Sequence, residues 1–297
     1  MGVGRGRGRL VRKRSRILTS VAFGATALLS GCAEDPADMA VDANDGGAAD
    51  VTSNKITGSV REWKVQVSAG KAEAGDVRFA ITNYGTIAHE FLVVKTEFDP
   101  GQIPLGDNNR FDEELKGIDV VDEIPEWEVN STGMLKVKLE PGQYELLCNI
   151  EGHYAAGMHT SFEVTPGNYT EAPPPGPKPS DEVSNDIDGF VKEWTVFAGN
   201  VKAKAGDVNF TIKNSGTIAH EFLVVKTDFE GGKIPLGKEN RFDEEAEGLK
   251  VVDEIPEWKP GDTGKLTVKL DPGKYQLLCN ITGHYKAGMW REFEVVG

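Results

Sequence analysis

The strongest constraint on the fold of this chain is a duplication. Residues 85–94 recur as residues 216–225, and residues 120–127 recur as residues 251–258, both at an offset of 131 positions and without a gap. A repeat of about 110 residues is far longer than the unit of a solenoid. A chain of 297 residues has room for about two domains of roughly 150 residues each. We therefore expect a tandem duplication of one whole domain.

Short alternating segments predict that each repeat is built from β-strands. Leu135, Val137 and Leu139 alternate with lysines, which is the pattern of a half-buried strand. Further strands are expected at residues 62–67, 77–81, 144–148 and 161–164. The stretch 97–127 is irregular and acidic, and a short helix is expected around residues 110–115. Short strands separated by Gly and Pro turns favour an all-β fold of two tandem Greek-key sandwiches or barrels.

Composition divides the chain into five segments. An Ala-, Asp- and Gly-rich stretch without periodicity precedes the first repeat, and a run of prolines at residues 173–179 separates the repeats. Such compositions are typical of a flexible tether and of an extended spacer, respectively. The predicted boundaries are 1–31 for a signal peptide, 32–54 for a flexible acidic tether, 55–165 for the first domain, 166–186 for a Pro-rich linker and 187–297 for the second domain.

The N-terminus predicts export. A basic stretch ends at Arg16, and the apolar stretch 17–29 that follows is too short to span a bilayer as a mature helix. The sequence Leu-Ser-Gly-Cys ending at Cys32 resembles the bacterial lipobox, which predicts cleavage before Cys32 and lipidation of its thiol. The alternative is an ordinary signal peptide that contains a cysteine. Loss of the seven basic residues before Cys32 would take the net charge from −14 to −21, which disfavours nucleic-acid binding.

Each repeat carries the same four potential metal ligands. The sets are His89, Cys148, His153 and Met158 in the first repeat, and His220, Cys279, His284 and Met289 in the second. Two imidazoles, one thiolate and one thioether form the ligand set of a mononuclear blue-copper site. The two cysteines occupy equivalent places in separate repeats, so we interpret them as metal ligands and not as a disulfide, although oxidising compartments usually pair cysteines.

A purely structural interpretation of these residues is the alternative. A buried Cys is often a core residue, a His on a strand is often simply hydrogen-bonded, and a Met often fills a gap. However, four of the five histidines fall into the two patterns at identical spacing. We therefore expect one type 1 copper site in each repeat, two per chain. The remaining histidine, His159, is expected to be an exposed strand residue.

Both repeats resemble cupredoxins, the small blue copper electron carriers. The Cys-x4-His-x4-Met loop is similar to that of rusticyanin and sulfocyanin. This resemblance implies that His153 and His284 lie near a surface where electrons enter and leave. It also implies that the carbonyls of Ala88 and Ala219 lie opposite the axial methionine.

The sequence departs from the cupredoxin pattern at two places in each repeat. The residue after the first ligand His is commonly Asn, which helps to tie down the Cys loop, but here it is Glu90 and Glu221. The position before the Gly-His pair is often Pro in members with a long loop, but here it is Glu151 and Thr282. These departures affect the expected reduction potential and loop rigidity, and they leave the ligands unchanged.

We interpret the chain as an exported, lipid-anchored carrier of single electrons and not as an enzyme. A multicopper oxidase or copper nitrite reductase needs several further histidines, and only His159 remains. The expected partners are redox proteins such as a cytochrome or a terminal oxidase, with no small-molecule substrate. The alternative is a copper carrier or storage protein that delivers copper to an oxidase, although the chain lacks a Met cluster. The net charges of −10 for residues 56–166 and −3 for residues 187–297 suggest that the domains differ in potential or partner, the alternative being drift after duplication.

Overall fold

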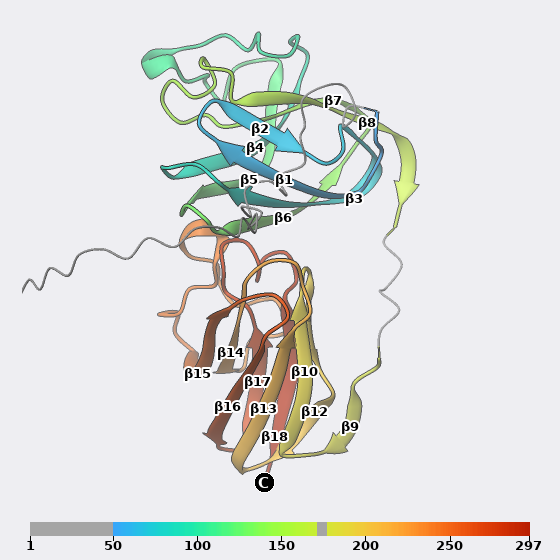
Figure 1. Cartoon of the computed structure of the whole chain (residues 1–297), viewed down its shortest axis with the longest axis vertical. Coiled ribbons are helices and arrows are strands. Elements are labelled where there is room, and N and C mark those ends of the chain that lie inside the picture. The colour runs from blue at the N-terminus through green and yellow to red at the C-terminus, as the bar shows by residue number, and fades with distance from the viewer. Residues whose placement is uncertain (1–49, 171–176) are drawn as a thin grey trace, which may run out of the picture. The chain divides into compact units, whose positions relative to one another are not determined.

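The computed structural model describes residues 50–170 and 177–297, and both repeats are all-β within them, as the sequence predicts. Figure 1 shows each repeat as strands packed in layers, with long connections at the strand ends. The predicted signal peptide and lipidation site at Cys32 lie outside the described residues. No helix of the described part is long and apolar enough to cross a membrane.

The first repeat forms eight strands, and one long strand, β3 (Lys71–Asn83), is hydrogen-bonded to strands of both layers. These strands are β1 (Lys55–Arg61), β2 (Lys64–Val67), β3 (Lys71–Asn83), β4 (His89–Thr96), β5 (Ile118–Trp127), β6 (Thr132–Leu139), β7 (Gly142–Leu147) and β8 (His159–Tyr169). Their order is β2-β1-β3-β8-β7-β4-β5, and β6 pairs with β3 at a sheet edge.

Strand β3 serves both layers of the sandwich. Its first residues, Lys71–Glu73, pair with β8, whereas its later residues pair with β1 and β6. The change of partner occurs at Gly75, whose φ of 130° is unfavourable for a residue with a side chain. A Cβ atom at Gly75 would overlap the carbonyl oxygen of Tyr169. The corner of the first sandwich therefore requires glycine.

The second repeat splits the equivalent long strand into two. Its strands are β9 (Ser180–Val183), β10 (Asp186–Lys192), β11 (Thr195–Ala198), β12 (Asn200–Lys204), β13 (Gly206–Asn214), β14 (His220–Thr227), β15 (Leu249–Trp258), β16 (Thr263–Leu270), β17 (Gly273–Leu278) and β18 (Trp290–Val296). They form the sheets β11-β10-β13-β16 and β15-β14-β17-β18-β12-β9. Strands β8 and β9 extend into the segment predicted as linker.

Each core is built around three phenylalanines contributed by different strands. In the first repeat, the ring of Phe79 lies 5.4 Å from that of Phe91 and 5.7 Å from that of Phe162. Phe210, with Phe222 and Phe293 around it, repeats these distances in the second. Burying each such ring contributes on the order of 2 kcal/mol. The alternation of apolar residues seen in the sequence therefore faces these cores.

Strands β4 and β14 are buried on both faces. One face packs into the sandwich core, and the other is covered by the segment that follows the strand. In the first repeat Leu92 and Val94 pack there against Ile103 and Phe111. In the second repeat the equivalent cluster contains Leu223, Val225, Ile234 and Phe242. This double burial fixes the strand that begins with the first ligand histidine of each repeat.

The predicted helix at residues 110–115 does not form. The stretch 97–127 instead has a short 3-10 helix at Asp107–Asn109, in which Asn108 has a positive φ of 58°. Asn tolerates this left-handed conformation, which favours a turn over a continued helix. The prediction of an irregular stretch was also too long, because residues 118–127 form β5.

Candidate metal centres

The ligand residues of each repeat meet at one end of the sandwich. His89 is the first residue of β4, and Cys148 directly follows the last residue of β7. These two strands are neighbours, with Leu92 opposite Leu147. His153 and Met158 lie in the loop that joins β7 to β8. The topology therefore brings a histidine from about 60 residues upstream beside the Cys loop.

In the first repeat the predicted nitrogen and sulfur ligands converge. The ligand atoms of His89, Cys148 and His153 lie within 4.8 Å of one another, and all three residues are buried. Cys148 Sγ lies 3.3 Å from Nδ1 of His153. The two imidazole ring centroids are 5.1 Å apart. This is a compact, three-sided group of donors.

The second repeat builds the same group from His220, Cys279 and His284, again within 4.8 Å and buried. Cys279 Sγ lies 3.2 Å from Nδ1 of His284 and 4.0 Å from Nδ1 of His220. Nδ1 of both imidazoles thus faces the sulfur. One metal ion could bind these three atoms together.

The methionines are held beside the groups by the backbone of the loop. Met158 and Met289 are fully buried. The amide of Cys148 donates to the carbonyl of Met158, and the amide of Met158 donates to the carbonyl of His153. The second loop has the same two hydrogen bonds. The short loop therefore fixes three predicted ligands relative to one another.

The donors of these groups fit a soft or borderline metal ion. Both ring nitrogens of His89, and Nε2 of His220, are buried without a hydrogen-bond partner. An unpartnered buried polar atom is costly, and a metal held by Nδ1 of His89 would satisfy one of these atoms. Burial lowers the pKa of His220 to about 4, so its imidazole is neutral. Burial raises the pKa of the Cys148 thiol to about 12. Neutral imidazole, thiolate and thioether together suit copper.

A carboxylate is hydrogen-bonded to the turn that leads into the strand carrying the first ligand histidine. Glu62 Oε1 accepts hydrogen bonds from the backbone N–H and the hydroxyl of Thr86, at 2.6 and 2.9 Å. The backbone hydrogen bond from Thr86 is the largest cause that lowers the pKa of Glu62, to about 2. The same oxygen lies 3.8 Å from Nε2 of His89. Glu193 and Thr217 repeat this arrangement in the second repeat.

In the second repeat, the glutamate that replaces the expected asparagine ties down the Cys loop. Glu221 Oε1 accepts a hydrogen bond of 2.7 Å from the amide of Asn280, the residue after Cys279. Burial raises the pKa of both Glu90 and Glu221 to about 7. A carboxyl group thus provides the acceptor at this position.

His159 is not part of a metal group. It begins β8, as a strand residue should, but it is partly buried where an exposed side chain was expected. Its Nδ1 lies 2.7 Å from Oε1 of Glu145, a buried carboxylate. Glu145 also accepts hydrogen bonds from the amide of Gly101 and the hydroxyl of Tyr154. This buried carboxylate explains why His159 turns inward.

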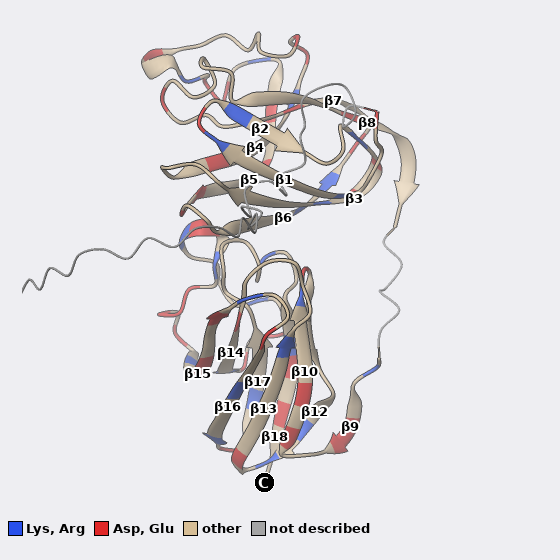
Figure 2. Ribbon diagram, in the orientation of Figure 1, with Lys and Arg blue, Asp and Glu red and all other residues tan. Residues whose placement is uncertain are grey.

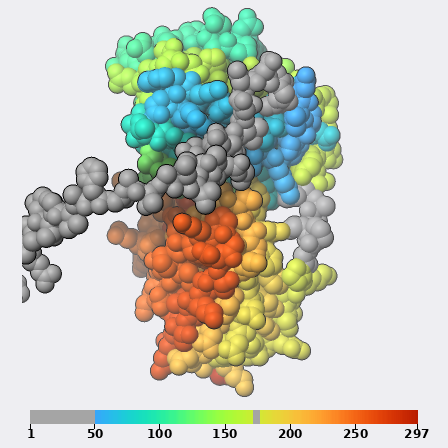
Figure 3. All heavy atoms as spheres, in the orientation of Figure 1, coloured from blue at the N-terminus to red at the C-terminus, as the bar shows by residue number. Residues whose placement is uncertain are grey.

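The two groups differ in their exposure. The exposed edge of the first is framed by Trp63, whose ring meets that of His153 edge-on at 5.4 Å. Trp63 is 54% exposed, and the blue segment around it lies at the surface in Figure 3. His153 itself is 5% exposed, whereas His284 is 0% exposed and Trp194, the equivalent of Trp63, is only partly exposed. The resemblance to cupredoxins implied that both histidines lie near a surface, and it did not predict this difference.

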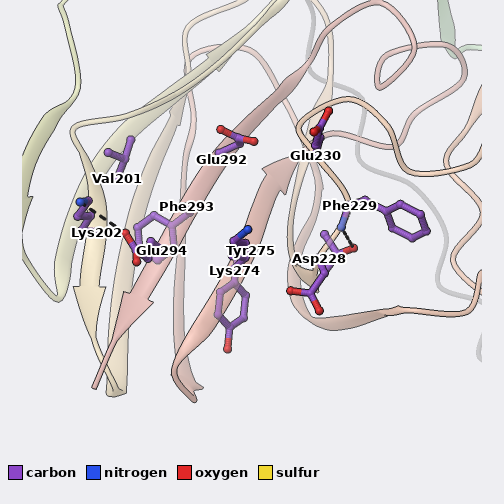
Figure 4. Close-up of a pocket in the computed structure, with 11 residues that line it drawn as sticks. Val201, Lys202, Asp228, Phe229, Glu230, Lys274, Tyr275, Glu292, Phe293 and Glu294 are labelled. Carbon is purple, nitrogen blue, oxygen red and sulfur yellow. Dashed lines mark hydrogen bonds and ion pairs between the residues drawn. The ribbon is translucent and has the colours of Figure 1, made fainter.

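A shallow pocket of about 380 Å³ lies elsewhere in the second repeat. Figure 4 shows its lining residues on β12, β17 and β18 and on the loop that follows β14, with Lys202 and Glu294 paired at 3.5 Å. None of the predicted metal ligands lines it. It therefore offers no substrate site next to a metal group.

No protein-family model and no curated protein matches the sequence. Among solved structures, a dithionite-reduced auracyanin from Roseiflexus castenholzii is 21% identical, and the match covers 39% of this chain and 100% of that one, with a TM-score of 0.33. Auracyanin A, a blue copper protein from Chloroflexus aurantiacus, is 19% identical with the same coverage and a TM-score of 0.30. A copper nitrite reductase from Nitrosomonas europaea is 13% identical over 83% of this chain and 95% of its own, with a TM-score of 0.26.

Proposed function

We propose that this protein carries single electrons through two type 1 copper sites, one in each repeat. The observation that carries the proposal is the pair of buried His/Cys/His groups, each with a buried methionine in the same short loop. Copper bound there would supply a one-electron couple. The chain's own residues hold the donors in one geometry, which favours fast exchange because little has to move on reduction.

The proposal does not include a catalytic role. A multinuclear copper centre needs additional histidines, and His159 is engaged by Glu145. Within the described residues, the candidate metal groups are the two already named. Electron transfer between proteins therefore assigns a role to every residue of the two candidate metal groups.

The proposed setting is the outer face of a membrane, with a lipid on Cys32 and a tether that ends before Val51, where the chain is hydrogen-bonded to Lys71. The partners would be redox proteins such as a cytochrome or a terminal oxidase. Figure 2 shows acidic residues on both repeats, and residues 56–166 carry 19 acidic against 9 basic residues. This charge favours a partner with a basic docking face.

The test is the visible spectrum and copper content of the oxidised protein, repeated with Cys148→Ser and Cys279→Ser. We expect intense blue colour and two coppers per chain, with each substitution removing half of both. Reductant should bleach the colour reversibly. Colourless or easily chelated copper would contradict the proposal and favour copper carriage or storage.

A further inference from the structure

The ligand loop of the second repeat is covered by the first repeat. Nε2 of His284 lies 3.0 Å from the carbonyl oxygen of Thr132 in β6. The amide of Met134 donates to the carbonyl of Thr282 at 3.1 Å. Thr132 and Met134 are alternate residues of β6, a strand at the edge of its sheet. The ligand loop of the second repeat is thus hydrogen-bonded to the carbonyl of Thr132 and the amide of Met134, two backbone groups on the free edge of β6.

Side chains extend this contact on both sides. Lys286 Nζ lies 2.8 Å from Oδ1 of Asp122. The guanidinium of Arg78 lies 5.3 Å from the centre of the Trp194 ring, within cation–π range. Met134 belongs to the same buried cluster as Ile281. The contact therefore combines apolar packing, hydrogen bonds to backbone groups, a cation–π contact and an ion pair.

The sequence of β6 is adapted to being covered. Met134 occupies an outward position on the strand, in line with Lys136 and Lys138, yet it is fully buried. The equivalent position in the second repeat is Lys265, which is exposed on the edge strand β16. A lysine on an edge strand prevents pairing, whereas a methionine permits it. The two repeats thus differ at this residue in the way that the contact requires.

The ligand loops differ in the same sense. Glu151, exposed in the first loop, is replaced by Thr282, which is buried in the second. Ala155 is replaced by Lys286, which provides the ion pair to Asp122. The first loop keeps its charge and its exposure. The residues that differ between the repeats, in β6 and in the ligand loop, are therefore those that meet in this contact. Random drift would not place the differences on both contacting surfaces.

We propose, resting on the proposed function, that the first repeat is the docking partner of the second site and that the two sites exchange electrons within the chain. His284 donates Nε2–H to Thr132, which leaves Nδ1 for the metal, a common arrangement for ligand histidines. An electron that enters at the first site would pass to the second, so that Cu(I) at the first would become Cu(II) and Cu(II) at the second would become Cu(I), and it would return by the same route. No proton is transferred. Electron exchange with other proteins then takes place at the first site, on the side where His153 lies beside the exposed Trp63.

The contacts define a continuous route between the sites. From Thr132 the chain passes to Ser131, whose carbonyl accepts a hydrogen bond of 3.1 Å from the indole of Trp127. Trp127 is buried and pairs with His89 across β5 and β4. A ligand of the second site is thus linked to a ligand of the first through Trp127.

The test of docking is amide hydrogen exchange at residue 134 in the full chain, with and without copper. We compare Met134→Lys with Lys265→Met, and Gly283→Ala with Gly152→Ala. Gly283 and Gly152 both have positive φ, but only a Cβ at Gly283 would overlap the carbonyl of Met134. We expect Met134→Lys and Gly283→Ala to speed exchange at residue 134 at least tenfold, and the two controls to leave it unchanged. Equal exchange in all variants would overturn the docking.

The test of the route is reduction by cytochrome c, with the sites isolated by Cys148→Ser or Cys279→Ser. We expect the second site alone to be reduced at least tenfold more slowly than the first alone, and Met134→Lys to remove most of this difference. Equal rates would overturn the internal route. A chain that binds no copper would instead overturn the proposed function, and hydrogen exchange in the metal-free chain would still decide the docking.

Discussion

At the scale of single residues, the metal groups were largely predictable because the chemistry lies in a short motif. Cys148, His153 and Met158 are close in sequence, so their proximity follows from one loop. The inward turn of His159 was not predictable, because it depends on Glu145 in the neighbouring strand β7. The second repeat has Gln276 and Trp290 at these positions, so the repeat pattern gave no guide.

Glu145 should be important for the stability of the first repeat. Glu145→Ala would leave the amide of Gly101 and the ring of His159 without their acceptor, and we expect a loss of about 2–3 kcal/mol of unfolding free energy. Glu145→Gln keeps an oxygen acceptor, as Gln276 does in the second repeat, and should cost less. Denaturant unfolding of both variants measures this. Equal costs would show that the acceptor is unimportant.

Copper loading should release protons from the buried thiols. Burial raises the pKa of Cys148 to about 12, so the metal-free thiol is protonated at neutral pH. Burial lowers the pKa of His220 to about 4, so this imidazole has no proton to lose. Because the metal binds thiolate, we expect about one proton released per copper between pH 6.5 and 8. Calorimetry in buffers of different ionisation enthalpy measures it. Loading without proton release would contradict thiolate ligation.

At the scale of strands, alternation predicted the half-buried elements, and the strand expected at residues 144–148 forms β7, whose last four residues are all buried. Leu135, Val137 and Leu139 face the core as expected. The covering segment after β4 gave no periodic signal, because its apolar residues reach the sheet from turns. Met134 was a signal of the covered edge, since it interrupts an outward row of lysines.

The sandwich corner allows a matched test of strand geometry. Gly75 and Gly206 occupy equivalent positions with φ of 130° and 125°. A Cβ at Gly75 would overlap Tyr169, whereas a Cβ at Gly206 would meet nothing within 4 Å. Gly206→Ala should cost about 1–2 kcal/mol through backbone strain alone. Gly75→Ala should cost clearly more in thermal unfolding, because β8 must also shift. Equal costs would contradict the close approach of β8.

At the scale of the whole molecule, duplication predicted two similar sites but not their different surroundings. The differing loop residues, Thr282 and Lys286 among them, were visible in the sequence. Their meaning depended on the opposing surface of β6, which sequence order does not bring near them.

The two coppers should therefore differ in their access to solutes. A hydrophilic chelator should remove copper faster from the first site, isolated by Cys279→Ser, than from the second, isolated by Cys148→Ser. The physical reason is that His153 lies beside exposed Trp63, whereas His284 is fully buried. The decay of the visible absorption measures both rates. Identical rates would contradict the difference in covering.

The central claim is that this chain carries two electrons, one at each site. The most direct measurement is an anaerobic reductive titration of the copper-loaded protein, followed by reoxidation. We predict reversible uptake of two electrons per chain, and of one electron in each of Cys148→Ser and Cys279→Ser. Uptake of no electrons, or of an unchanged number after either substitution, would contradict the claim.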